Sequence, residues 1–376
     1  MKKNYISALA VLACVAVFCT ISGNSFHQMR TATEEIIPGE GVTEVRMLSD
    51  YFPDLAGTAG DTQIYVLQGE QEGGSCLILG GTHANELGGH MGAVLFVENA
   101  KVEAGTLYVI PRTNNSAFTH NDPQEGHPST VHITTDEGNV REFIHGSRAT
   151  NPVDQWPDPD VYVNYMGQSL SGSENRNISR TYPGKADGTL TEMMSYGIVQ
   201  LINTENIDVT VDLHEASPEY PVINALIAHE RAMNLASNVV VDMQMEGVQI
   251  SLEPSPTDLR GLTHRELGDH TDTLALLMEA PNPAQGRLRD RTDEALVLTG
   301  KSETYVKAGE IGQLYVPYDE NGWPIEVRCA RHVFGIERIL ANYSEMYEEP
   351  IIVTGMPSYD ELVKNGMGPY LNEPTT

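Results

Sequence analysis

The stretch "SCLILGGTHANELGG", residues 75–89, joins a short apolar run to a glycine-rich segment. The apolar run is typical of a buried strand. Just past its end, His83 and Glu86 stand three residues apart, with glycines on both sides. A single His–Glu pair at this spacing usually lies exposed on the protein surface, so its meaning depends on which residues stand at the other strand ends.

Alternating strand and helix patterns surround this stretch. Apolar runs at 62–69 and 105–114 flank it, and residues 89–99 have helically spaced apolar positions. A strand, a turn, a helix and another strand in this order form a βαβ unit. The alternation resumes later, with strands expected at 207–215 and 272–280 and helices at 189–203, 229–244 and 329–347. The sequence therefore predicts an α/β fold, with a mixed, mostly parallel sheet flanked by helices.

The chain divides into four segments by composition. We expect a signal peptide or N-terminal anchor at 1–23, an N-terminal extension at 24–57, a catalytic domain at 58–347 and a C-terminal tail at 348–376. A polar stretch around 116–175 with few apolar runs interrupts the α/β pattern. Stretches of that length are usually functional loops or insertions, and we interpret this one as a loop insertion.

The first residues have the layout of an export signal. Lys2 and Lys3 precede an apolar run from Tyr5 to about Ile21, and small residues follow it. A secretory signal has this order, and the run is nearly long enough to stay as a membrane anchor. Both interpretations predict an exported protein that is periplasmic, extracellular or associated with the cell envelope, with membrane contact only through the possible anchor.

Charge and cysteine content narrow the function classes. The formal net charge is −29, and a surface this acidic repels nucleic acid, so no nucleic-acid partner is expected. Outside the export segment the cysteines are Cys76 and Cys329. They could form one disulfide in an oxidising compartment or remain buried thiols.

Three predicted strand ends carry polar residues that suit one reaction. His83 and Glu86 follow the first strand, while His214 and Glu279 end two later ones. Active sites of open α/β sheets lie at the carboxyl ends of strands. Two histidines and a glutamate form a catalytic zinc site that leaves one position for water. We therefore predict one Zn²⁺ per chain, with Glu279 as the carboxylate that moves the proton.

Several motifs resemble one family. "GGTHANELGG" (80–89) resembles the first zinc motif of the succinylglutamate desuccinylase/aspartoacylase family, a branch of the zinc carboxypeptidase superfamily. "NISRTYPG" (177–184) is similar to the family's Asp-Leu-Asn-Arg-x-Phe-Pro-Gly, and "VDLHE" (211–215) to the strand with the third ligand. "LLMEAP" (276–281) resembles the strand with the catalytic glutamate, and the motifs occur in family order.

The resemblance implies a role for each matching residue. His83, Glu86 and His214 would bind zinc, and Glu279 would be the general base and acid. Arg180 would hold a substrate carboxylate or polarise the scissile carbonyl. A guanidinium suits that task because it donates two parallel hydrogen bonds to a carboxylate.

The chain also departs from the family pattern. Ser179 stands where the motif has asparagine, and Asn177 where it has aspartate. A serine can still hydrogen-bond a substrate, but with a shorter reach. A second arginine usually precedes the motif; Arg176 is nearby but poorly aligned with it, and Arg112 is another candidate. Arg265, just before the last of the predicted strands, is a further candidate for binding an anion.

The predicted function is zinc-dependent hydrolysis of an amide bond. Water activated by the metal would attack the carbonyl of an N-acyl amino acid or short peptide that bears a carboxylate. Alternatives are a carboxypeptidase of the same superfamily, a cell-wall peptide amidase, and a non-catalytic zinc-containing envelope binding protein. Glu279 argues against the last alternative, because binding alone requires no general base.

Overall fold

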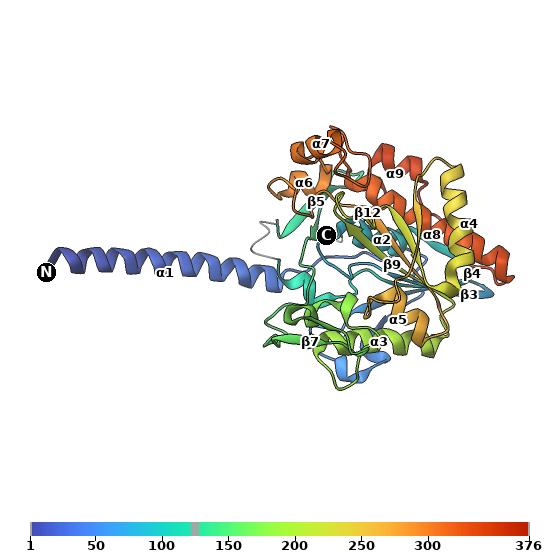
Figure 1. The fold of residues 1–376 in the computed structure, drawn as a ribbon, viewed down its shortest axis with the longest axis horizontal. Helices are drawn as coiled ribbons and strands as arrows, with labels where there is room; N and C mark the ends of the chain where they lie inside the picture. Colours follow the sequence, from blue (N-terminus) through green and yellow to red (C-terminus); the bar gives the residue numbers. More distant parts are fainter. Residues whose placement is uncertain (1, 122–127, 375–376) are drawn as a thin grey trace.

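The computed structural model describes residues 2–121 and 128–374. Among them, nine strands form one mixed sheet in the order β1-β2-β4-β3-β9-β12-β10-β11, and β13 pairs with β4 (Figure 1). The strands are β1 (Glu44–Met47), β2 (Gln63–Gln68), β3 (Gln71–Leu79), β4 (Lys101–Ile110), β9 (Val209–Ala216), β10 (Ala225–Ala228), β11 (Ser251–Pro254), β12 (Leu274–Pro281) and β13 (Ile352–Thr354).

The centre of this sheet is parallel. Strands β4, β3, β9 and β12 run in one direction, and β2 and β10 pair antiparallel on either side of them. Parallel strands are covered on both faces and read as continuous apolar runs, as "SCLIL" does. The prediction of a mixed, mostly parallel sheet between helices is confirmed.

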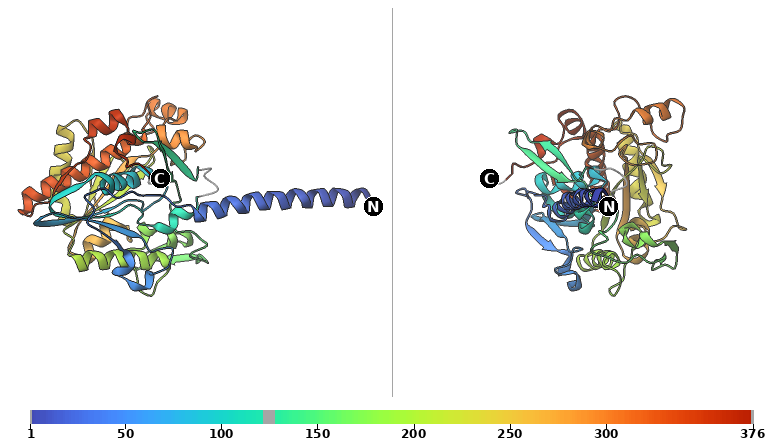
Figure 2. Two further views of the ribbon diagram at one scale, coloured as in Figure 1. Left: turned by 180° about the vertical axis from the view of Figure 1, so that it is seen from behind. Right: turned by 90° about the vertical axis from the view of Figure 1, so that its left-hand side faces the viewer.

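Helices cover both faces of the sheet (Figures 1 and 2). Helices α2 (Leu87–Asn99), α4 (Met233–Met245) and α8 (Ile325–Tyr347) pack on one face around the larger hydrophobic core. Helices α3 (Leu190–Glu205) and α5 (Thr263–His270) pack on the other. The shorter helices α6 (Glu294–Thr299), α7 (Glu303–Glu310) and α9 (Tyr359–Asn365) lie on the side of α8.

The segments outside the predicted α/β pattern also contain structure. The polar stretch at 116–175 holds two hairpins, β5 (Thr130–Thr134) with β6 (Val140–Ile144), and β7 (Val161–Val163) with β8 (Ser169–Ser171). Strands β1 and β13 come from the predicted extension and tail, and both pair into the main sheet. The sheet therefore extends beyond the boundaries predicted for the catalytic domain.

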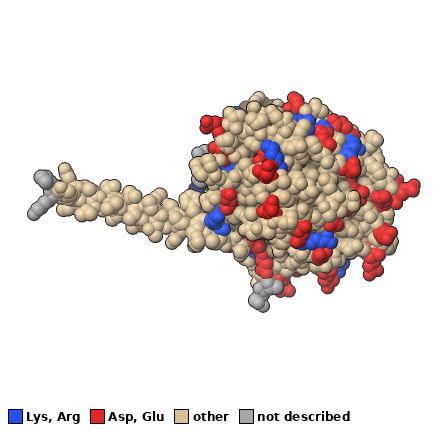
Figure 3. Space-filling model, turned by 90° about the horizontal axis from the view of Figure 1, so that it is seen from below, with Lys and Arg blue, Asp and Glu red and all other residues tan. Residues whose placement is uncertain are grey.

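Helix α1 (Lys2–Thr31) projects from the body (Figure 1). Its span Asn4–Thr31 is long and apolar enough to cross a membrane by length and composition, because it contains an 18-residue window with a mean hydropathy of 2.3. Figure 3 shows its exposed surface without charged side chains over most of its length, whereas the body is dotted with acidic groups. The base of the helix joins the body through Arg30, whose guanidinium lies 2.8 Å from the Asp154 carboxylate.

Candidate metal centre

The loop between β3 and α2 reaches two strand ends because glycines allow close approach there. Gly81 has a φ of +58°, a left-handed conformation that favours glycine. Gly89, in the first turn of α2, lies directly against β9, since a Cβ on it would lie 2.3 Å from the Leu213 carbonyl oxygen. The glycine-rich sequence thus lets the loop that carries His83 and Glu86 lie beside the end of β9.

Three side chains from this loop and β9 meet at one buried point. His83 Nδ1 lies 2.7 Å from Glu86 Oε1, and His214 Nδ1 lies 3.0 Å from Glu86 Oε2. One ligand atom from each residue lies within 4.8 Å of the other two. The structure therefore brings together the three residues that the sequence predicts as metal ligands.

The other nitrogen of each imidazole is held by an acceptor. His83 Nε2 lies 3.0 Å from Asn177 Oδ1, and the Asn177 amide nitrogen donates to Glu174 at 2.8 Å. His214 Nε2 lies 2.8 Å from Asp212 Oδ2. Amide and carboxylate oxygens only accept, so each Nε2 donates its proton to them. Both Nδ1 atoms are then directed as ligand atoms at the same point.

The charges of the cluster depend on each other. Burial alone would raise the pKa of Glu86, but His83 and His214 hold it well below its usual range. Burial alone would lower the pKa of His214, while Asp212 and Glu86 raise it well above its usual value. Burial, aided by the charge of Arg148, lowers the pKa of His83 to about 4. An ionised Glu86 and a neutral His83 are in the protonation states that bind metal ions, whereas binding through His214 Nδ1 requires the release of its proton.

This donor set fits a zinc ion. Catalytic zinc sites commonly have three protein ligands, drawn from imidazole nitrogens and carboxylate oxygens, and keep a fourth position open. Here two Nδ1 atoms and one carboxylate converge on a buried point. Their hydrogen-bonded outer partners are of the kind that orient ligating histidines in metal sites. The residues present therefore match what a zinc ion requires.

Glu279 lies beside the cluster on the neighbouring strand. In the register of β12 and β9, it stands directly opposite His214. Its Oε2 atom is buried and has no hydrogen-bond partner among the described residues. Burial raises the pKa of Glu279 to about 8, although the nearby His214 acts in the opposite direction. A carboxyl group that titrates near neutral pH can both accept and return a proton during a reaction.

Two arginines line the same cavity as the cluster. The cavity has a volume of about 370 Å³, and its lining includes Arg148 and Arg180. Arg148 Nη1 lies 3.5 Å from Glu86 Oε1. Burial lowers the pKa of Arg180, and the charge of Arg148 lowers it further. Two guanidinium groups that face one cavity create a favourable position for an anion.

Four polar atoms in the cavity lining lack hydrogen-bond partners within the described part of the chain. They are Ser179 Oγ, Thr263 Oγ1, Gln285 Nε2 and Glu279 Oε2, and all four are buried. Buried polar groups are nearly always paired, so an unpaired group calls for an explanation. Their position around one cavity indicates that the cavity receives a polar ligand.

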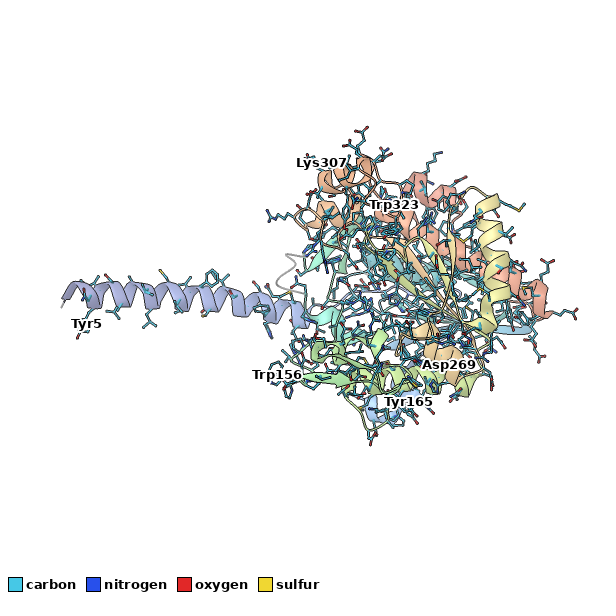
Figure 4. The ribbon with its side chains drawn as sticks, in the orientation of Figure 1. Tyr5, Trp156, Tyr165, Asp269, Lys307 and Trp323 are labelled. Atoms are coloured by element: carbon cyan, nitrogen blue, oxygen red, sulfur yellow. The ribbon has the colours of Figure 1, made fainter. Side chains whose placement is uncertain are left out.

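The other two predicted arginines lie outside the cavity. Arg112 packs over the ring of Phe118 at 4.6 Å from its centroid. Arg265 forms ion pairs with Glu230 at 2.6 Å and with Asp269 at 2.8 Å. Figure 4 labels Asp269 on α5, below the sheet. The charge of Arg265 is therefore already balanced by two carboxylates, and neither arginine lines the cavity in this structure.

Some residues at the site were not among the predicted ones. Arg148 lies in the predicted insertion and lines the cavity together with Arg180. Its basic charge is the sequence signal that could have identified Arg148, because basic residues are scarce in this chain, with 23 lysines and arginines against 52 acidic residues. Asp212 and Asn177 hold the two imidazoles, and their positions within the quoted motifs are the only sequence signal for them.

The two cysteines of the folded body are buried. Cys76 lies in β3 and Cys329 in α8, and both are free thiols in the described structure. Burial raises the pKa of each thiol beyond the physiological range. The sequence allowed either a disulfide between these cysteines or two buried thiols, and in the structure both are buried thiols.

No family model matches this sequence, and no curated protein is significantly similar to it. Solved structures align with the chain at low identity. A succinylglutamate desuccinylase from Silicibacter sp. is 14% identical, with a TM-score of 0.42, over 76% of this chain and 61% of that one. The product-bound cell shape determinant protein Csd4 from Helicobacter pylori is 12% identical, with a TM-score of 0.46, over 80% and 59%.

A metallo-carboxypeptidase from Burkholderia cenocepacia is 11% identical, with a TM-score of 0.45, over 85% of this chain and 68% of that one. The chain thus spans about three fifths of the length of the desuccinylase and of Csd4.

Proposed function

We propose that the protein is a zinc-dependent hydrolase that cleaves the amide bond of an N-acyl amino acid or short peptide bearing a carboxylate. The observation that carries this proposal is the convergence of three ligand atoms beside an unpartnered carboxyl group. His83, Glu86 and His214 offer a zinc donor set, and Glu279 Oε2 lies in the same cavity without a hydrogen-bond partner among the described residues.

The proposed zinc ligands and the Glu279 carboxyl group have different roles in the reaction. A zinc ion held by two imidazoles and a carboxylate activates water as a nucleophile and polarises a carbonyl group. Glu279 accepts a proton from the attacking water and returns it to the amide nitrogen as the carbon–nitrogen bond breaks. The reaction consumes one water and yields one carboxylate and one amine. Asn177 and Asp212 keep the imidazoles in the orientation that binding requires.

The two arginines would act at different parts of the substrate. Arg148 lies against Glu86, next to the ligand cluster, where charge develops on the carbonyl oxygen during attack. Arg180 also lines the cavity and would bind the carboxylate of the substrate. Ser179 and Gln285, each with a buried unpaired atom, would bind other polar groups of the same substrate.

We place this reaction outside the cytoplasm. The proposal is supported by α1, which is apolar over the length of a membrane span and has the position of an export signal or anchor. The base of α1 lies close to the metal loop, because Ala32 packs in a small cluster with Ala84, the neighbour of His83. If α1 remains in the membrane, the catalytic cavity is held close to it.

The test uses the zinc-loaded full-length chain and a panel of N-acyl amino acids and peptides with free carboxylates. Glu279→Gln should keep zinc and lose turnover by about 10²–10⁴-fold, the usual contribution of a general base. Glu337→Gln is the matched control, since Glu337 on α8 also has a pKa raised by burial, to about 7, but lies outside the cavity. Its turnover should equal that of the wild type.

Three outcomes would contradict parts of this proposal. Wild-type rates in Glu279→Gln would refute the role of this carboxylate. Faster cleavage of longer peptides than of N-acyl amino acids would favour a carboxypeptidase or peptide amidase. A wild-type protein that binds zinc and panel compounds but hydrolyses none of them would be a binding protein.

A further inference from the structure

The sheet face that carries the reacting groups has a second row of side chains beside them. Glu279 stands opposite His214, while Leu277 stands opposite Asp212 on β9 and Ile227 on β10. Residues two apart on a strand share a face, so Leu277 and Glu279 point the same way. The two rows are separated by about 7 Å, the rise of two residues along a strand.

Leu277 and Ile227 form one side of the cavity together with residues from two loops. We call this surface the apolar wall and define it as Val222, Ile227, Leu259, Leu262 and Leu277. Three of these residues, Val222, Ile227 and Leu277, also form a small apolar cluster separate from the two main cores. Apolar side chains that line a ligand cavity favour apolar parts of the ligand, because contact removes both surfaces from water.

Arg180 lies next to the apolar wall. Gly261 directly precedes Leu262, and a Cβ on Gly261 would lie 2.2 Å from the Arg180 carbonyl oxygen. Tyr220, two residues before Val222, interacts electrostatically with the Arg180 guanidinium. A ligand whose carboxylate binds Arg180 therefore has its neighbouring substituent close to the apolar wall.

The end of the second row is acidic. Glu253 on β11 stands opposite Ile227 and lines the cavity. An acidic group placed on the apolar wall would lie between Glu253 and Glu279 and would be repelled by any negative charge on them. It would also lose its hydration against leucine and isoleucine side chains. The wall therefore disfavours acidic substituents.

We propose that the apolar wall selects substrates whose carboxylate-bearing residue has an aliphatic or aromatic side chain. In an α-amino acid residue, the carboxylate and the side chain are attached to the same carbon. This matches the adjacency of Arg180 and the wall. The inference rests on the proposed amide hydrolysis and names the substrate class of that site.

The first test compares kcat/KM of the zinc-loaded full-length chain for four substrates: N-acetylleucine, N-acetylalanine, N-acetylaspartate and N-acetyllysine. The leucine compound should exceed the alanine compound by at least about tenfold, the discrimination expected from added apolar carbons in a pocket. The aspartate compound should be the poorest. A kcat/KM for N-acetylaspartate equal to or higher than that for N-acetylleucine would overturn the proposal. A kcat/KM for N-acetyllysine equal to or higher than that for N-acetylleucine would also overturn it, and would identify Glu253 as the selecting group.

The second test changes the wall. Ile227→Ala should lower the leucine-to-alanine ratio of kcat/KM by about tenfold, because it removes apolar contact for the larger side chain only. Leu226→Ala is the matched control, since Leu226 precedes Ile227 on β10 but belongs to the main core. A general loss of structure would lower kcat/KM for both substrates and leave their ratio unchanged. An unchanged ratio in Ile227→Ala would contradict selection by the wall.

A binding measurement separates failure of this inference from failure of the proposed function. Zinc-loaded Glu279→Gln is titrated calorimetrically with N-acetylleucine and with N-acetylaspartate. Tighter binding of the leucine compound, with no amide turned over by the wild type, would refute hydrolysis and leave the selectivity intact. Two outcomes would refute the selectivity alone, provided that the wild type hydrolyses its substrates. In the first, the aspartate compound binds as tightly as the leucine compound or more tightly. In the second, neither compound binds.

Discussion

The two sides of the cavity are built in opposite ways. On the side of β3 and β9, His83, Glu86 and His214 are buried in a network in which each imidazole has an acceptor on its outer nitrogen. On the side of β10 and β11, the side chains of Leu277 and Ile227 form an apolar contact. Both sides belong to one continuous sheet, and β12 contributes to each, with Glu279 in one row and Leu277 in the other.

We expect the polar side of the cavity to control the reaction and the apolar side to control which substrate is accepted. The polar side is fixed by directional hydrogen bonds, so a small change there should disturb the ligand geometry and with it the reaction. The apolar side has no such directional contacts, so a change there should alter which substrate fits while the reacting groups remain in place. The following predictions test this separation, from the largest expected effect to the smallest.

Glu86→Gln should abolish metal binding and turnover. The substitution keeps the size of the side chain but removes the carboxylate that faces both Nδ1 atoms. The contribution of a bound metal is several kcal/mol, so turnover should fall by at least about 10³-fold. Metal content and kcat measured on the same preparation check this. Normal metal content in the variant would show that the cluster is not the metal site.

Arg148→Ala should lower kcat by about 10²–10³-fold and change KM little. Its guanidinium lies next to the ligand cluster, where the negative charge of the transition state develops, and loss of one such donor has an effect of this size. Steady-state kinetics separate the two constants. A rise in KM with an unchanged kcat would show instead that Arg148 only binds the ground-state substrate.

Arg180→Ala should raise KM by about 10–100-fold, as expected for the loss of hydrogen bonds between charged groups. Arg265→Gln is its control, because the Arg265 guanidinium is engaged by Glu230 and Asp269 outside the cavity. The control should leave KM within about twofold of the wild type. Equal increases in KM for the two variants would remove the basis for assigning the carboxylate to Arg180.

The metal-free protein should show a pH-dependent effect of Glu279→Gln on stability. The folded-state pKa of Glu279 is raised from 4.5 to about 8, so the folded protein holds this proton more tightly than the unfolded chain. The stability from this group is present below pH 4.5 and is lost as the pH rises toward 8.

Glutamine has no proton to lose at this position. The melting temperature of Glu279→Gln minus that of the wild type should therefore increase by several degrees between pH 5 and 8, since one pKa unit is worth about 1.4 kcal/mol. Melting curves in a chelator measure this difference. A difference that is constant with pH would contradict the burial of an unpartnered carboxyl.

The sequence predicted the central sheet and the grouping of His83, Glu86 and His214 because both leave local signals. Continuous apolar runs mark parallel strands buried on two faces, and His83, Glu86, His214 and Glu279 follow or end such runs. Strand ends that lie far apart in the chain are adjacent in the sheet, so residues at those ends could be grouped before the structure was known.

Other parts of the site depend on contacts that leave no local signal. Arg148 reaches the cavity from a polar segment whose hairpins pair with themselves. Arg112 and Arg265 have the same charge, but their surroundings engage them elsewhere. The apolar wall arises from the cross-strand neighbours of Leu277, and those neighbours are set by the antiparallel pairing of β10, which the sequence did not reveal.

The central claim is that His83, Glu86 and His214 hold one zinc ion. Its most direct test is the metal content of the purified full-length chain, measured by mass spectrometry for the wild type, His83→Ala and the control His132→Ala. His132 is an exposed histidine outside the cluster. We predict about one zinc per chain in the wild type and the control, and almost none in folded His83→Ala. A folded wild-type protein that takes up no stoichiometric zinc when it is supplied would contradict the account.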